Sequence, residues 1–135
     1  ATPPRHGAAI HAVCRAMNLR PAAAPDLPAI HAIYSQHVLH GLASFEEVPP
    51  SVEEMGRRHA EVIGMGLPYL VAEEAGVLLG YGYCSLYRTR SAYRYTLEDS
   101  IYIRQGMQGK GTGKALLGEL IRTCEALNYR QMVAV

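Results

Sequence analysis

Three glycines at alternate positions, Gly109, Gly111 and Gly113, mark the segment whose residue types and spacing most directly indicate chemistry. They lie within residues 108–114, and an apolar sequence with helical spacing follows. Glycine lets the backbone turn sharply and approach a ligand without side-chain obstruction. The free N–H groups at the start of the next helix, with the positive end of its dipole, attract anions. The segment therefore predicts a phosphate-binding loop.

Two common phosphate loops do not fit this segment. In the Walker frame that ends at Gly113 and Lys114, glutamine replaces the first glycine and Ala115 replaces the hydroxyl that binds Mg²⁺. The dinucleotide fingerprint needs G-x-G-x-x-G, whereas these glycines alternate and no acidic residue follows at the expected distance. The pattern that fits is Q-x-x-G-x-G, which begins at Gln108 and follows the strand-like residues 99–103.

The chain resembles the GCN5-related N-acetyltransferases, whose loop for the pyrophosphate of acetyl-CoA reads [QR]-x-x-G-x-[GA]. Within that superfamily it is most similar to the phosphinothricin and methionine sulfoximine acetyltransferases. The resemblance covers most of residues 18–135 and is carried, in the family's order, by residues 19–22, 32–34, 43–46, 68–73, 87–94, 98–103 and the loop. It implies an acetyl-CoA-dependent N-acetyltransferase without a metal, acting on a small amino-acid-like amine such as phosphinothricin, methionine sulfoximine or methionine sulfone.

Composition agrees with a small enzyme of one domain. Thirteen basic and 12 acidic residues give a net charge of +1, so no strong field attracts nucleic acid or an anionic membrane. There is no apolar run of membrane-spanning length and no secretory signal pattern. Cys14, Cys84 and Cys124 are widely spaced and odd in number, which argues against a disulfide framework or a zinc site and favours a reducing cytoplasm.

Periodicity and turn residues predict a mixed α/β (α+β) sheet with the element order βααβββαβ. Asp26 is expected to cap the first helix, and Ser51 and Glu54 form a capping box for the second. The expected elements are a strand at 17–20, helices after Asp26 and Ser51, strands at 69–74, 77–87 and 95–104, a helix after the loop, and a strand at 131–135.

This order is the core of the acyl-CoA N-acyltransferase (GNAT) fold up to its fifth strand. The resemblance implies a further helix and two strands, which the sequence lacks. A last strand at the sheet edge would leave backbone groups unpaired, so either another chain covers it or the sequence is a fragment; we favour a fragment. We expect residues 1–16 to be a disordered N-terminal extension, residues 17–135 to be a C-terminally incomplete acetyltransferase domain, and the protein to be a homodimer.

Glu98 is the candidate catalytic residue. Acetyl transfer needs a neutral amine and a donor for the developing oxyanion, and a glutamate in the middle of a strand can take the amine proton directly or through water. The resemblance also implies this role, because the family group has its catalytic glutamate in an E-[DH]-S-[VI]-Y segment. Alternatively, Glu98 pairs with Arg90 or Arg94, or lies on a polar strand face. Asp99 points to the opposite face and is expected to be structural.

The donor site is expected along the same strand and the loop. The resemblance implies that backbone groups around Ile101, Tyr102 and Ile103 pair with the pantetheine arm of acetyl-CoA, while their side chains suit a core equally well. The loop residues expected at the pyrophosphate are Gln108, Gly109, Lys110, Gly111, Thr112, Gly113 and Lys114. The two lysines add positive charge there, or else are ordinary surface residues.

The acceptor pocket is predicted from aromatic and charged residues near the first helix and the third strand. Arginine would bind a carboxylate with two hydrogen bonds and an aromatic ring would pack on the acceptor side chain; the alternative is a surface loop rich in both types. The candidates are Phe45, Glu46, Tyr83, Arg88, Arg90 and Tyr93. His37 and His40 have helical spacing, but no third ligand is suitably spaced, so no metal is predicted.

Two alternatives to the small-molecule acetyltransferase stay open. The first is a non-catalytic CoA-binding or regulatory module, suggested by the missing C-terminal part. The second is an enzyme that acetylates the N-terminus of a peptide or protein, which would need a broad acceptor groove.

Overall fold

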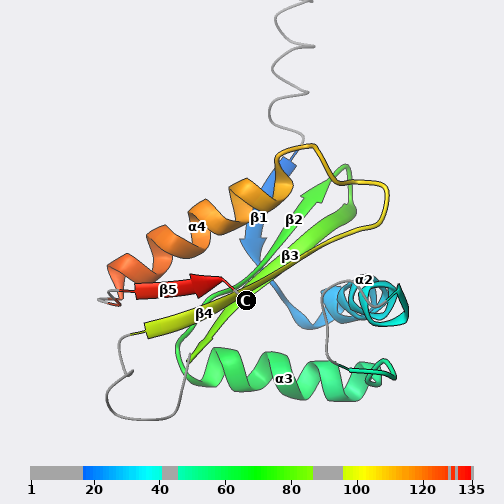
Figure 1. Cartoon of the computed structure of the whole chain (residues 1–135), viewed down its shortest axis with the longest axis horizontal. Helices are drawn as coiled ribbons and strands as arrows, with labels where there is room; N and C mark the ends of the chain where they lie inside the picture. The colour runs from blue at the N-terminus through cyan, green and yellow to red at the C-terminus, as the bar shows by residue number, and fades with distance from the viewer. Residues whose placement is uncertain (1–16, 41–45, 87–95, 128, 130, 135) are drawn as a thin grey trace, which may run out of the picture.

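The computed structural model describes residues 17–40, 46–86, 96–127, 129 and 131–134. Its elements, in chain order, are β1 (Met17–Pro21), the 3-10 turn η1 (Ala24–Asp26), α2 (Leu27–His40), α3 (Val52–Gly64), β2 (Tyr69–Glu74), β3 (Val77–Leu86), β4 (Thr96–Ile103), α4 (Thr112–Ala126) and β5 (Gln131–Ala134) (Figure 1). This order confirms the predicted α/β fold. The expected extension, residues 1–16, lies outside the described residues.

The strands form one sheet in the order β1-β2-β3-β4-β5. The first four are antiparallel to their neighbours, whereas β5 is parallel to β4. The β4–β5 register runs from Thr96↔Gln131 to Asp99↔Ala134, so within the described residues β5 pairs with only the first half of β4. The second half of β4 leads directly to the glycine-rich loop and α4.

Helices cover both faces of the sheet. Figure 1 shows α4 across one face and α2 and α3 on the other. On the α4 face, Leu116 and Leu120 are fully buried. On the opposite face, Ile30 of α2 and Met55 of α3 are buried in the same way. Burying these apolar faces is the main force that fixes each helix on the sheet.

The two predicted helix starts have different outcomes. The Ser51 hydroxyl accepts a hydrogen bond from the Glu54 N–H at 3.1 Å, which confirms Ser51 as the N-cap of α3. The Glu54 carboxylate binds Arg57 and Arg58 instead of completing the predicted capping box. Asp26 precedes α2, but its carboxylate binds residues that come before it in the chain instead of capping that helix. It accepts hydrogen bonds from the Ala23 N–H at 2.8 Å and from two Arg20 nitrogens at 2.7 and 2.8 Å. The predicted cap role is therefore wrong, because a guanidinium is the stronger partner.

The α4 face of the sheet also buries polar groups. Asp99 lies there, opposite in orientation to Glu98 as predicted, and is 6% exposed. Its Oδ1 atom has no hydrogen-bond partner in the described part of the chain, and burial raises the pKa of this carboxyl. Nearby, the thiols of Cys84 and Cys124 are free and 3.6 Å apart.

Among the described helices, none has the length and apolar character needed to cross a membrane.

Candidate functional site

The backbone of β4 presents its hydrogen-bonding groups alternately to its two edges. The Arg104 N–H donates to the Leu79 carbonyl at 2.7 Å, one position beyond the end of β4. Hydrogen-bonded and non-hydrogen-bonded pairs alternate in an antiparallel ladder. The backbone groups of Tyr102 therefore face β3, whereas those of Ile101 and Ile103 face the opposite edge.

On that opposite edge, the described pairing with β5 reaches Asp99. The Ile103 carbonyl lies 3.1 Å from Nε2 of His37, which reaches it from α2. Within the described residues, the backbone groups of Ile101 and the Ile103 N–H have no strand partner, so an extended ligand could pair with them as a further strand does.

The glycine-rich loop continues from this edge to the start of α4. Gly106, Gly109 and Gly111 have φ angles of +85°, +84° and +79°, a region that residues with a Cβ rarely adopt. Gly111 is the N-cap residue of α4. Inside the loop, the Gln108 side chain accepts a hydrogen bond from the Gly106 N–H at 3.0 Å. Such a turn holds the backbone N–H groups at the positive end of the helix dipole.

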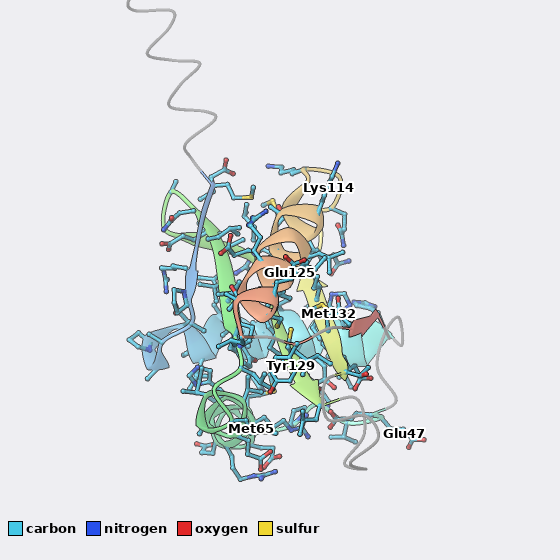
Figure 2. All side chains as sticks on the ribbon, turned by 90° about the vertical axis from the view of Figure 1, so that its left-hand side faces the viewer. Glu47, Met65, Lys114, Glu125, Tyr129 and Met132 are labelled. Carbon is cyan, nitrogen blue, oxygen red and sulfur yellow. The ribbon has the colours of Figure 1, made fainter. Side chains whose placement is uncertain are left out.

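The predicted side chains of the loop have different surroundings. Lys110 and Lys114 are exposed, and Lys114 extends from the first turn of α4 into solvent (Figure 2). Neither forms an ion pair within the described residues. Thr112 is 2% exposed and its hydroxyl faces the Met17 sulfur at 3.6 Å. The two lysines can therefore meet an anion from solvent, whereas Thr112 can offer only its backbone.

A cleft of about 390 Å³ lies between the end of α2 and this loop. It is lined by Gln36, His37, His40, Gln105 and Gln108. His40 Nε2 lies 3.0 Å from the Gln36 side-chain oxygen. The described residues hold no cluster of three or more His, Cys, Asp or Glu side chains suited to a metal ion.

Glu98 lies on the other face of β4, toward α2 and α3, and is half-buried. Ser100 and Tyr102 share this face by strand alternation. Burial is the main cause that raises the pKa of Tyr83, and the charge of Glu98 contributes, which places Glu98 near that ring. Glu98 forms no hydrogen bond or ion pair with a residue that the structure describes. Arg90 and Arg94, the alternative partners of Glu98, lie outside the described residues.

A cluster of tyrosines forms the floor beside Glu98. The rings of Tyr69, Tyr81 and Tyr83 are stacked, with centroids 4.9 to 6.4 Å apart. Tyr102 stacks on Tyr81 at 5.3 Å, and Tyr34 of α2 meets Tyr102 edge-on at 5.1 Å. Such a surface suits the apolar part of a small ligand.

Glu46 is fixed by two elements. Its carboxylate accepts hydrogen bonds from the Tyr34 hydroxyl at 2.5 Å and from two nitrogens of Arg58 at 2.8 and 3.2 Å. The Arg58 guanidinium also binds Glu54 at 3.0 Å. The hydrogen bond from Arg58 is the main cause that lowers the pKa of Glu46. Both groups are therefore charged at neutral pH.

Of the six residues predicted for the acceptor, Glu46 and Tyr83 are described and both lie on the face of Glu98; Phe45, Arg88, Arg90 and Tyr93 lie outside the described residues. The sequence interpretation missed Tyr34, Tyr69, Tyr81 and Arg58. One available signal was the Tyr-x-Tyr spacing at 81 and 83, which puts both rings on one strand face.

Comparison with known proteins gives consistent matches. The Acetyltransferase (GNAT) family matches residues 26–135. The chain is 59% identical over 109 residues to a phosphinothricin N-acetyltransferase from Alcaligenes faecalis, a match that covers 81% of this chain and 55% of that protein. It is 35% identical over 118 residues to an L-methionine sulfoximine/L-methionine sulfone acetyltransferase from Salmonella typhimurium, covering 87% of this chain and 69% of the relative.

A solved structure supports the same family. A GNAT superfamily phosphinothricin acetyltransferase from Sinorhizobium meliloti, solved in complex with AcCoA, matches with a TM-score of 0.85 and 50% sequence identity. The match covers 89% of this chain and 65% of that one. Compared with its Alcaligenes relative, this chain spans about half of the length. The family match covers most of the chain and confirms the resemblance: the protein belongs to the GNAT acetyltransferase family.

Proposed function

We propose that this protein is an acetyl-CoA-dependent N-acetyltransferase acting on the amine of a small amino-acid-like acceptor. The observation that carries the proposal is the arrangement of β4. One strand presents the Glu98 carboxylate on its tyrosine-lined face and, beyond its described pairing with β5, a backbone edge at Ile101 and Ile103 that leads into the glycine-rich loop.

The open edge and the loop fit the two ends of a CoA molecule. The amide groups of a pantetheine arm can pair with Ile101 and Ile103 as an added strand would. The backbone N–H groups at Gly111 and the start of α4 suit its pyrophosphate. A Cβ added at Gly113 would lie 3.8 and 4.0 Å from Ile103 Cδ1 and Cγ1, so this glycine faces the end of β4. Lys110 and Lys114 add positive charge from solvent.

The reaction assigns Glu98 the role of general base. The acceptor amine forms a bond to the thioester carbon, the carbon–sulfur bond breaks, and the CoA thiolate takes up a proton. Glu98 removes the amine proton, directly or through water, because an ammonium has no lone pair for attack. A backbone N–H at the open edge of β4 donates to the developing oxyanion.

The acceptor would lie against the tyrosine face beside Glu98. Glu46 and Tyr83 contribute to its walls, and we retain Phe45, Arg88, Arg90 and Tyr93 as acceptor residues. The names of the Alcaligenes and Salmonella relatives support phosphinothricin, methionine sulfoximine or methionine sulfone as the substrate class. A cytoplasmic homodimer also remains a prediction.

The proposal is tested by measuring thiol release from acetyl-CoA with these amino acids and with a peptide N-terminus as a second acceptor class. We expect turnover with the amino acids and none with the peptide. Turnover with the peptide alone would make the protein a peptide acetyltransferase. Thermal stabilisation by CoA without any turnover would make it a non-catalytic CoA-binding module. Either result would refute the proposal.

A further inference from the structure

The hydroxyl of Tyr81 is a buried donor that has no partner among the described residues. Tyr81 lies in the middle of β3, is 0% exposed, and has its ring between Tyr69 and Tyr102. Its oxygen forms no hydrogen bond in the described part of the chain. Burial raises the pKa of Tyr81, so the hydroxyl keeps its proton. Burial without a hydrogen-bond partner is unfavourable for a hydroxyl, so pairing with a ligand oxygen would be favourable at this point.

Tyr81 lines a small pocket between the sheet and helices α2 and α3. The pocket has a volume of about 20 Å³, enough for one oxygen-sized group but not for a whole side chain. Its other walls are Tyr34, Met55, Arg58, Tyr69 and Tyr83. It is therefore a narrow, mostly apolar recess with an uncommitted hydroxyl among its walls.

Three of the other polar groups around the recess already have partners. Arg58 binds the carboxylates of Glu46 and Glu54, and the Tyr34 hydroxyl donates to Glu46. Tyr83 forms a hydrogen bond with Ser100. Tyr81 carries the fully buried hydroxyl without a partner in the described part of the chain, so we take it as the donor for a ligand oxygen that enters the recess.

We propose that the Tyr81 hydroxyl donates a hydrogen bond to the oxygen on a tetrahedral sulfur or phosphorus in the acceptor side chain. The inference rests on the proposed function and specifies its substrate class. An acceptor of this kind carries both an oxygen for the hydroxyl and a methyl group for the aromatic and methionine walls.

The spacing along β4 fits such an acceptor. Tyr81 pairs with Tyr102 of β4. Tyr102 lies four residues from Glu98 along this strand, which corresponds to about 13 Å between the Cα atoms of Tyr102 and Glu98. Five bonds separate the amine nitrogen from the side-chain oxygen in methionine sulfone, a reach of about 6 Å. The acceptor alone does not span this distance. The rest can be bridged by the Glu98 and Tyr81 side chains, with a hydrogen bond at each end of the acceptor.

The test is the Tyr81→Phe variant, assayed with acetyl-CoA and four acceptors. Methionine sulfone and methionine sulfoximine carry the oxygen on sulfur, phosphinothricin carries it on phosphorus, and methionine has the same chain without oxygen. We expect kcat/KM to fall about tenfold for the oxygen-bearing acceptors that the protein uses and to change less than about twofold for methionine. A fall in kcat/KM confined to the two sulfur compounds, or to phosphinothricin, identifies whether Tyr81 binds the oxygen on sulfur or the oxygen on phosphorus.

The melting temperature separates a ligand oxygen from a structural water in the recess. Removing an unpaired hydroxyl should leave the melting temperature of the ligand-free protein unchanged or higher, whereas loss of a bound water's partner would lower it. Tyr129→Phe is the matched control, because Tyr129 lies just beyond the end of α4 (Figure 2), and should change neither quantity.

Two results would overturn the inference: an equal fall in kcat/KM for all four acceptors, or a lower melting temperature of Tyr81→Phe than of Tyr129→Phe. These outcomes differ from failure of the proposed function, in which the wild-type protein acetylates none of the four.

Discussion

Replacing Gly80 with alanine should force β3 and β4 apart. Gly80 lies opposite Ile103 in the sheet. An added Cβ would lie 2.8 Å from the Tyr102 carbonyl oxygen, 2.9 Å from Ile103 Cδ1 and 3.3 Å from Ile103 Cα. Two of these atoms belong to the backbone of β4, which cannot rotate away as a side chain does. The strand itself must therefore move.

The expected cost combines overpacking and weakened pairing. Overpacking costs about 1–3 kcal/mol, and each weakened ladder hydrogen bond adds about 0.5–1.5 kcal/mol, so we expect a loss of about 2–4 kcal/mol in the free energy of unfolding. For a domain of this size that corresponds to a melting temperature lower by roughly 6–20 °C. Because the same movement shifts Ile103, the KM for acetyl-CoA should rise as well.

The assay is thermal unfolding followed by circular dichroism, with Gly64→Ala as the control. A Cβ at Gly64, the last residue of α3, meets nothing within 4 Å. Alanine there should stabilise the protein by about 0.5–1 kcal/mol. A melting temperature for Gly80→Ala within about 2 °C of the wild type would refute the described β3–β4 packing.

Two further predictions concern pH. Arg20→Met should lower stability at pH 7, with the buried Asp26 accounting for about 1–3 kcal/mol. Hydrogen bonds from Arg20 lower the pKa of Asp26 and Glu73, so this stability is present above about pH 4 and is lost in acid. The calorimetric melting temperatures of the variant and the wild type should therefore converge in acid. Persistence of the full difference in acid would contradict this account. Because burial raises the pKa of Asp99, ionisation of this carboxyl costs stability as the pH rises. Asp99→Asn should therefore raise the melting temperature at about pH 8 but not at about pH 4. An equal gain at both pH values would contradict ionisation of Asp99 as the cause.

The sequence predicts features that depend on local chemistry. Glycine permits a sharp turn, and Gly109 and Gly111 adopt positive φ angles there, whereas Gly113 lies within α4. Strand alternation alone puts Glu98 and Asp99 on opposite faces, and the burial of Asp99 agrees. These features follow from a few neighbouring residues, so they can be recognised before the chain is folded.

Features built from distant residues could not be predicted in this way. The tyrosine cluster needs the β2–β3 register, which shifts between Ala72 and Glu73 and so cannot be counted from the turn. Arg58 meets Glu46 only because α3 returns beside α2. Asp26 fits a helix-cap pattern, yet its carboxylate binds Arg20 on another element.

The kinetics of Glu98→Gln test the central claim, that the two sides of β4 have separate roles. Glutamine keeps the shape of the side chain but cannot act as a general base, so we expect kcat to fall by about 10²–10⁴-fold. The KM for acetyl-CoA should stay within about twofold, because the donor binds along the backbone edge rather than at this carboxylate. Glu125→Gln, an exposed position on α4 (Figure 2), should leave both values unchanged. An unchanged kcat in Glu98→Gln would contradict the account.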